Sequence, residues 1–158
     1  EGGRRELPDR SRLSPEAGVA GDAWGRRAKR TADTQITAMQ ADVAELIANG
    51  QLTLFGANLF LELDLSARNL PVGSRLRIGA PVLEVTPVPH NGCRKFQARF
   101  GQEALRFVSG KELRQRNLRG ISAGGGARRR PTGIGKGAEA RRISDRARVH
   151  GDPVDRHA

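Results

Sequence analysis

The chain contains one cysteine, Cys93, and the residues around it could make its thiol reactive. Arg94 and Lys95 follow it directly, and His90 precedes it by three residues. Nearby cations stabilise a thiolate relative to a thiol, and the thiolate is both the nucleophilic form of cysteine and a soft ligand for thiophilic metals. The alternative is that Cys93 is a small buried hydrophobic side chain, as lone cysteines commonly are. The local sequence leaves both interpretations open.

Pairing Cys93 with His90 would allow two further kinds of site. A zinc site needs four ligands, and the other histidines, His150 and His157, fall in an Arg/Gly-rich segment with no predicted structure. A catalytic Cys–His pair needs a third residue that orients the histidine, and the sequence does not identify one. Neither site is favoured. The glycine-rich stretches 124–126 and 133–137 lack the spacing of a phosphate-binding loop, and we interpret them as low complexity.

The elements that would position these residues begin with a predicted helix over 37–49. Thr37-Ala38-Met39-Gln40 has the form of a capping box, in which a hydroxyl and a glutamine satisfy free amides at a helix start. Apolar side chains then recur at helical spacing up to residue 47. Asn49-Gly50 supplies a left-handed helix stop.

The pattern of side chains over residues 51–88 predicts β-strands. Apolar and polar side chains alternate over 59–65, and again over 75–78 and 82–86, as they do in half-buried strands. Gly79-Ala80-Pro81 is short enough to join the last two as a hairpin. Closely spaced strands with short connections favour a barrel or a sandwich over a parallel α/β sheet. We therefore expect a mainly β fold with a few short helices.

The proline-rich segment 87–92 is expected to be irregular and to lead the chain into Cys93. Phe96 and Phe100 then lie four residues apart, which predicts a short helix that ends at Gly101. Apolar periodicity disappears after Ile121, where arginine and glycine dominate, so we expect the C-terminal tail to be disordered. Only 147–149 and 153–154 could form a last short strand.

The charge and composition of the chain bear on its partners and on its location in the cell. The 158 residues carry a net charge of +11, and their Arg-rich end would attract nucleic acid and other polyanions without sequence preference, although such runs are commonly just solvated. A single cysteine excludes an internal disulfide. No signal peptide and no apolar run of about 18 residues is present, so we expect a cytoplasmic protein that does not enter a membrane. Because the chain begins at Glu1, we expect a fragment or a processed product.

Several short motifs occur in the order found in one known family. They are Val19-Ala20-Gly21-Asp22, Gln35-Ile36-Thr37, Gly56-Ala57-Asn58-Leu59, Leu70-Pro71-Val72-Gly73, Val82-Leu83-Glu84-Val85-Thr86, Pro89-His90-Asn91-Gly92-Cys93 and Leu118-Arg119-Gly120-Ile121. Together they make the chain similar to the MOSC family, named for the C-terminal domain of molybdenum cofactor sulfurases. The resemblance runs from about Leu13 to Ile121. No single motif is specific, but the ordered set is.

The resemblance implies a barrel-like β fold and a cysteine that ligates molybdenum of the pterin cofactor or carries sulfur as a persulfide. Cys93 is that residue, and Asn58 would shape the pocket beside it. Arg94, Lys95 and Arg119 are our candidates for contacts to the pterin phosphate, chosen from their charge. Reductase members of the family imply reduction of N-hydroxylated small molecules with an electron-donor protein.

Two other functions stay open. A persulfide carrier would exchange sulfur with a donor or acceptor protein and need no reductase activity of its own. A non-catalytic module would bind polyanions through the basic tail, which a deletion of residues 122–158 would remove.

The chain also departs from the family. Trp24 stands where many members place a histidine, and Ala57 where an acidic residue is common. We expect an N-terminal extension over 1–12, a MOSC-like domain over 13–121 and a basic tail over 122–158. The family supplies further strands where this tail begins, so the tail is either disordered or the product of an out-of-frame reading. Trp24, the only tryptophan, is expected in the core or in a pocket wall.

Overall fold

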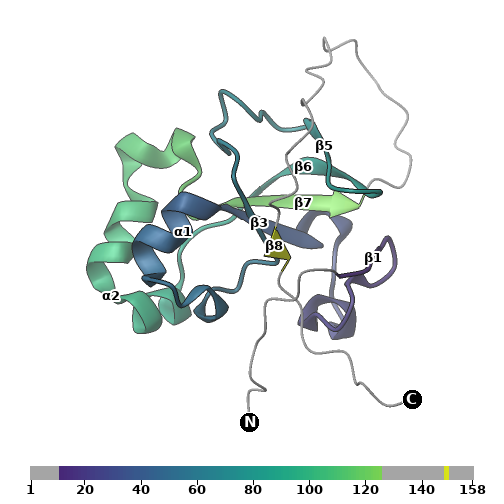
Figure 1. Ribbon diagram of the computed structural model, residues 1–158, viewed down its shortest axis with the longest axis horizontal. Coiled ribbons are helices and arrows are strands. Elements are labelled where there is room, and N and C mark those ends of the chain that lie inside the picture. The colour runs from purple at the N-terminus through teal and green to yellow at the C-terminus, as the bar shows by residue number, and fades with distance from the viewer. Residues whose placement is uncertain (1–10, 126–147, 150–158) are drawn as a thin grey trace.

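The computed structural model describes residues 11–125 and the backbone of residues 148–149. The fold is mainly β, as expected, and its larger sheet curls into a half-barrel (Figure 1). A two-stranded sheet pairs β1 with β2, and the six-stranded sheet has the order β5-β6-β7-β3-β4-β8. The strands are β1 (Leu13–Ser14), β2 (Gly18–Val19), β3 (Ile36–Gln40), β4 (Leu59–Leu61), β5 (Arg75–Arg77), β6 (Val82–Pro89), β7 (Ile121–Gly125) and β8 (Arg148–Val149).

Helices cover one side of the larger sheet. They are α1 (Ala41–Ala48) and α2 (Arg94–Ser109), with the short 3₁₀ segments η1 (Ala23–Arg26), η2 (Ala32–Thr34), η3 (Leu52–Leu54) and η4 (Lys111–Arg116). Figure 1 shows α1 and α2 together at one end of the sheet. The part of the chain that the structure describes contains no helix long and apolar enough to span a membrane.

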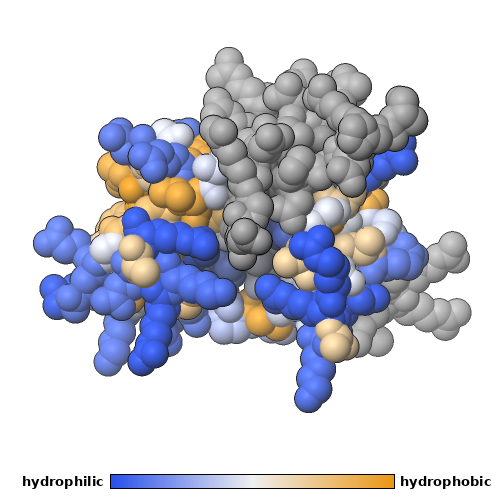
Figure 2. Space-filling model, turned by 90° about the horizontal axis from the view of Figure 1, so that it is seen from below, coloured by the Kyte–Doolittle hydropathy of each residue, from blue (hydrophilic) through white to orange (hydrophobic). Residues whose placement is uncertain are grey.

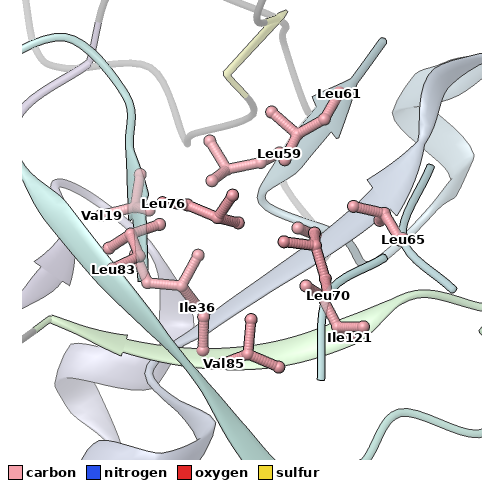
Figure 3. Close-up of a cluster of buried hydrophobic side chains, with 12 residues drawn as sticks. Val19, Ile36, Leu59, Leu61, Leu65, Leu70, Leu76, Leu83, Val85 and Ile121 are labelled. Atoms are coloured by element: carbon pink, nitrogen blue, oxygen red, sulfur yellow. The ribbon is translucent and has the colours of Figure 1, made fainter. Parts of the chain in front are cut away.

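Two apolar clusters lie on opposite faces of β3. Ile36 and Ala38 face the first, where side chains from the curled strands point toward one another (Figure 3). Met39 faces the second, which α1, α2 and η3 close. A strand that is buried on both faces carries a nearly continuous apolar run, and such a run can be mistaken for part of a helix.

The predicted helix start at Thr37 is therefore wrong. Residues 36–40 form β3, which pairs with β4 in parallel and with β7 antiparallel, and α1 begins at Ala41. The Thr37 hydroxyl bonds the Asn58 side chain at 3.0 Å instead of capping a helix. Leu46, expected on the buried face, is 73% exposed. The left-handed stop is confirmed at Asn49, whose φ is 46°.

The predicted hairpin between β5 and β6 is confirmed by antiparallel pairing of Leu76 with Leu83. The strand predicted over 59–65 is shorter and ends at Leu61. The Asp64 carboxylate accepts the backbone N–H of Ser66 at 2.8 Å, which turns the chain there. β6 continues through the segment expected to be irregular and reaches Pro89 with a register shift before it.

The expected end of the domain at Ile121 falls at the start of a central strand. β7 lies between β6 and β3 and continues to Gly125. A side chain at Gly124 would place Cβ 2.6 Å from the Ala32 carbonyl oxygen, so packing requires a glycine here. The interpretation of Gly124 as part of a low-complexity stretch is therefore wrong. Farther along, Arg148–Val149 pairs with β4, one of the two expected last strands. The remaining expectations for residues 126–147 and 150–158 lie outside the described residues.

Candidate functional site

A cavity of about 300 Å³ lies where β3, η1, the segment before β4 and the start of α2 meet. This volume is at the lower end of the range typical of small-molecule sites, roughly 300–1,000 Å³. Four of the five predicted site residues line it: Asn58, Cys93, Lys95 and Arg119. Arg94 is exposed and does not line the cavity.

Cys93 is the N-cap of α2 and lies at the cavity mouth with an exposed side chain. The pKa of Cys93 is lowered, chiefly by the backbone N–H of Phe96 and also by Lys95 and Arg119, while partial burial raises it. The Cys93 side chain accepts no cap hydrogen bond at the start of α2. These groups make the thiolate easier to form than in a free cysteine, and the exposure of Cys93 excludes the alternative of a buried side chain.

Arg119 is the buried cation of the cavity, with 6% of its surface exposed. Its Nε has no hydrogen-bond partner, and Nη1 approaches only the Met39 sulfur, at 4.0 Å, among the described residues. Its guanidinium carbon lies 5.1 Å from the ring centre of Phe96 and 5.9 Å from that of Phe55. Aromatic rings attract a cation but do not use its N–H donors, so Arg119 keeps free donors for an anion.

The pKa of Arg119 is lowered to about 10, chiefly by burial and also by the charge of Arg99, while Cys93 acts in the opposite direction. At neutral pH Arg119 is therefore still charged. No carboxylate neutralises it within the described part of the chain. A buried charge without a partner is unfavourable, and a bound anion is the usual way to compensate it.

The chain is folded tightly to place Arg119 between the helices and β3. Asn117 before it is left-handed, with φ 50°, and donates its side-chain amide to the Leu65 carbonyl at 2.9 Å. Gly120 after it has φ 117°, and a side chain there would place Cβ 2.2 Å from the Ala38 carbonyl oxygen. This close approach lets β7 begin directly after Gly120.

His90 also faces the cavity, and its buried Nε2 has no hydrogen-bond partner. Burial, followed by the charge of Arg119, lowers the pKa of His90 to about 3. His90 is therefore neutral at physiological pH and too weakly basic to deprotonate a substrate efficiently. The sequence shows that His90 lies near Cys93 in the chain. It does not show that burial and the charge of Arg119 lower the pKa of His90.

Asn58 has a structural role in the cavity wall. Its side-chain oxygen accepts the Thr37 backbone N–H at 2.9 Å and the Thr37 hydroxyl at 3.0 Å. Its own backbone N–H donates to the Thr37 carbonyl at 2.8 Å. These bonds fix the segment before β4 against β3, where Asn58 lines the cavity.

Sequence reasoning missed other wall residues. Arg27 and Arg99 add positive charge, and Arg99 is held by a 2.8 Å bond from Nη1 to the Leu54 carbonyl. The one acidic wall residue, Asp22, accepts the Trp24 backbone N–H at 2.7 Å. Trp24 is buried and lines the cavity, as expected of it. On the face seen in Figure 2, hydrophilic side chains gather at the lower left and lower right.

The cavity thus combines a cysteine of lowered pKa, a buried cation and further cations on its wall. No cluster of three or more His, Cys, Asp or Glu side chains suited to a metal ion occurs among residues 11–125, so the zinc site that the sequence did not favour has no support there. Comparisons with protein-family models, with curated proteins and with solved structures found no match for this chain.

Proposed function

We propose that this protein binds the molybdenum cofactor, with Cys93 as the protein ligand to the metal and Arg119 as the partner of the cofactor's phosphate. The observation that carries the proposal is the buried, unpaired guanidinium of Arg119 in the same cavity as the exposed thiol of Cys93. The ordered motifs that resemble the MOSC family support it independently.

The residues present suit that group. A thiolate is the soft ligand that a sulfur-rich metal centre prefers. The guanidinium of Arg119 on the cavity wall offers charge-assisted hydrogen bonding to a phosphate, and Lys95 adds a second cation on the wall. Arg94, a candidate from the sequence, is less suitable because it does not line the cavity.

When bound, the cofactor would supply two-electron redox chemistry, as in reduction of N-hydroxylated small molecules. The protein's own residues hold and orient it. Cys93 offers its sulfur at the mouth, where a small substrate or an electron-donor protein can approach. Neutral His90 and the wall residue Trp24 confine the space behind it.

The test is the molybdenum and pterin content of the protein purified from a host that makes the cofactor. We expect both in the wild type, loss of the metal in Cys93→Ser, and at least a tenfold loss of pterin in Arg119→Met. Arg94→Met is the matched control, and we expect it to retain wild-type content because its side chain lies outside the cavity. A wild-type protein free of molybdenum and pterin would refute the proposal.

Exposure of Cys93 favours a second candidate, the persulfide carrier, because a carried sulfur must reach a partner. Such a protein would need no metal. Finding neither metal nor pterin in the wild type, together with a persulfide on Cys93 detected by mass spectrometry, would support this candidate over the first.

A further inference from the structure

The same cavity has the features that a small sulfur-donating oxyanion requires. Its volume of about 300 Å³ is small, and cations outnumber the single acidic side chain on its wall. Arg119 is nine-tenths buried, lines the cavity and has no carboxylate partner among the described residues. Cys93 lies at the mouth of that cavity. A ligand that spans these two residues is therefore an anion at its inner end and meets a sulfur nucleophile at its outer end.

We propose that the cavity accepts thiosulfate-type sulfane donors, with the oxyanion on Arg119 and the outer sulfur presented to Cys93. This inference rests on the persulfide-carrier candidate and names its donor. It does not depend on the molybdenum cofactor, since the reaction needs no metal.

The transfer is balanced without a further reagent. The Cys93 thiolate attacks the outer sulfur of thiosulfate, a sulfur–sulfur bond forms to Cys93, and the sulfur–sulfur bond of thiosulfate breaks. Sulfite leaves with the electron pair of that bond, and Cys93 is left as a persulfide. A second nucleophile, such as a thiolate or cyanide, takes the outer sulfur and returns Cys93 to the thiolate.

The other wall residues suit this chemistry better than phosphoryl or acyl transfer. Sulfite leaves as a stable anion and needs no proton, whereas an alkoxide or amine leaving group needs a general acid. Because the pKa of His90 is lowered to about 3, its ring is neutral at physiological pH and is a poor general acid. A thiolate and a dianion repel each other, and the adjacent charge of Arg119 offsets that repulsion at the point of attack.

The test uses the full chain without cofactor, thiosulfate as donor and cyanide as acceptor, and follows thiocyanate formation. We expect turnover by the wild type, none by Cys93→Ser, and at least a tenfold lower kcat/KM, mainly through KM, for Arg119→Met. Arg119→Lys, which keeps the charge, should recover part of that loss. Arg94→Met should stay within twofold of the wild type.

Binding can be separated from folding and from turnover. In Cys93→Ser the fluorescence of Trp24, the only tryptophan and a wall residue, should change on adding thiosulfate and saturate. Circular dichroism shows whether Arg119→Met is folded, and Arg119→Lys serves if it is not. A wild-type protein that forms a persulfide from polysulfide but not from thiosulfate would overturn the inference and leave the carrier candidate standing. A wild-type protein that forms a persulfide from neither donor would refute both the inference and the carrier candidate.

Discussion

A charged arginine that is buried without an anionic partner raises the free energy of the folded protein, so its presence at a cavity wall needs an explanation. Arg119 is stabilised in part by the rings of Phe55 and Phe96, but these leave Nε without a partner. A bound anion in the cavity that Arg119 lines would compensate its charge. At the scale of single residues, Arg119 therefore indicates a ligand more strongly than Cys93 does, because a reactive thiol alone does not define what it meets.

The first prediction concerns the proton on Cys93. Arg119 lowers the pKa of this thiol, so removing the cation in Arg119→Met should raise it, and the pH midpoint of alkylation by iodoacetamide should move upward. Lys95→Met should act in the same direction, because Lys95 lowers that pKa through its backbone N–H and its charge, and only the charge is removed. Arg94→Met should leave the midpoint in place. Equal midpoints in the wild type and Arg119→Met would show that Arg119 does not act on the thiol.

At the scale of elements, the sequence predicted those parts of the fold that depend on local patterns. The β5–β6 hairpin has alternating side chains and a short turn, and Gly101, with φ 86°, interrupts α2 where a helix end was expected. β3 was mistaken for a helix because both of its faces are buried, so it lacks the alternation that marks a strand. The cavity could be predicted only in part, since long-range packing of β7 against β3 brings Arg119 to the wall that Cys93 also lines.

The element prediction tests the turn into β7. Gly120→Ala should destabilise the protein by about 3 kcal/mol or more, because the new Cβ would meet the Ala38 carbonyl oxygen at 2.2 Å and φ is 117°. Gly73→Ala is the control for backbone strain alone, since Gly73 has φ 87° and no atom within 4 Å of the added Cβ, and should cost about 1 kcal/mol. Urea denaturation measures both. Equal losses of stability in Gly120→Ala and Gly73→Ala would mean that the close approach of Gly120 to Ala38 is not needed.

At the scale of the whole molecule, β7 joins the two halves of the larger sheet. It pairs with β6 on one side and with β3 on the other, so residues 122–125 belong to the sheet and not to a tail. Ser122, Ala123 and Gly124 are buried within this strand. An out-of-frame reading of the gene would have to begin after Gly125, because residues 121–125 pack within the sheet.

The last prediction follows from this arrangement. A chain that ends at Ile121 should not fold, because it loses most of the strand between β6 and β3, whereas a chain that ends at Gly125 should fold and keep the cavity. The second truncation also removes β8, so β4 loses its outer partner and the midpoint of urea denaturation should fall. It is therefore the correct variant for asking whether the basic residues after Gly125 bind nucleic acid. If they do, retention on a polyanion column at low salt should be lost while far-ultraviolet circular dichroism keeps its folded form. A folded chain ending at Ile121 would contradict the central place given to β7.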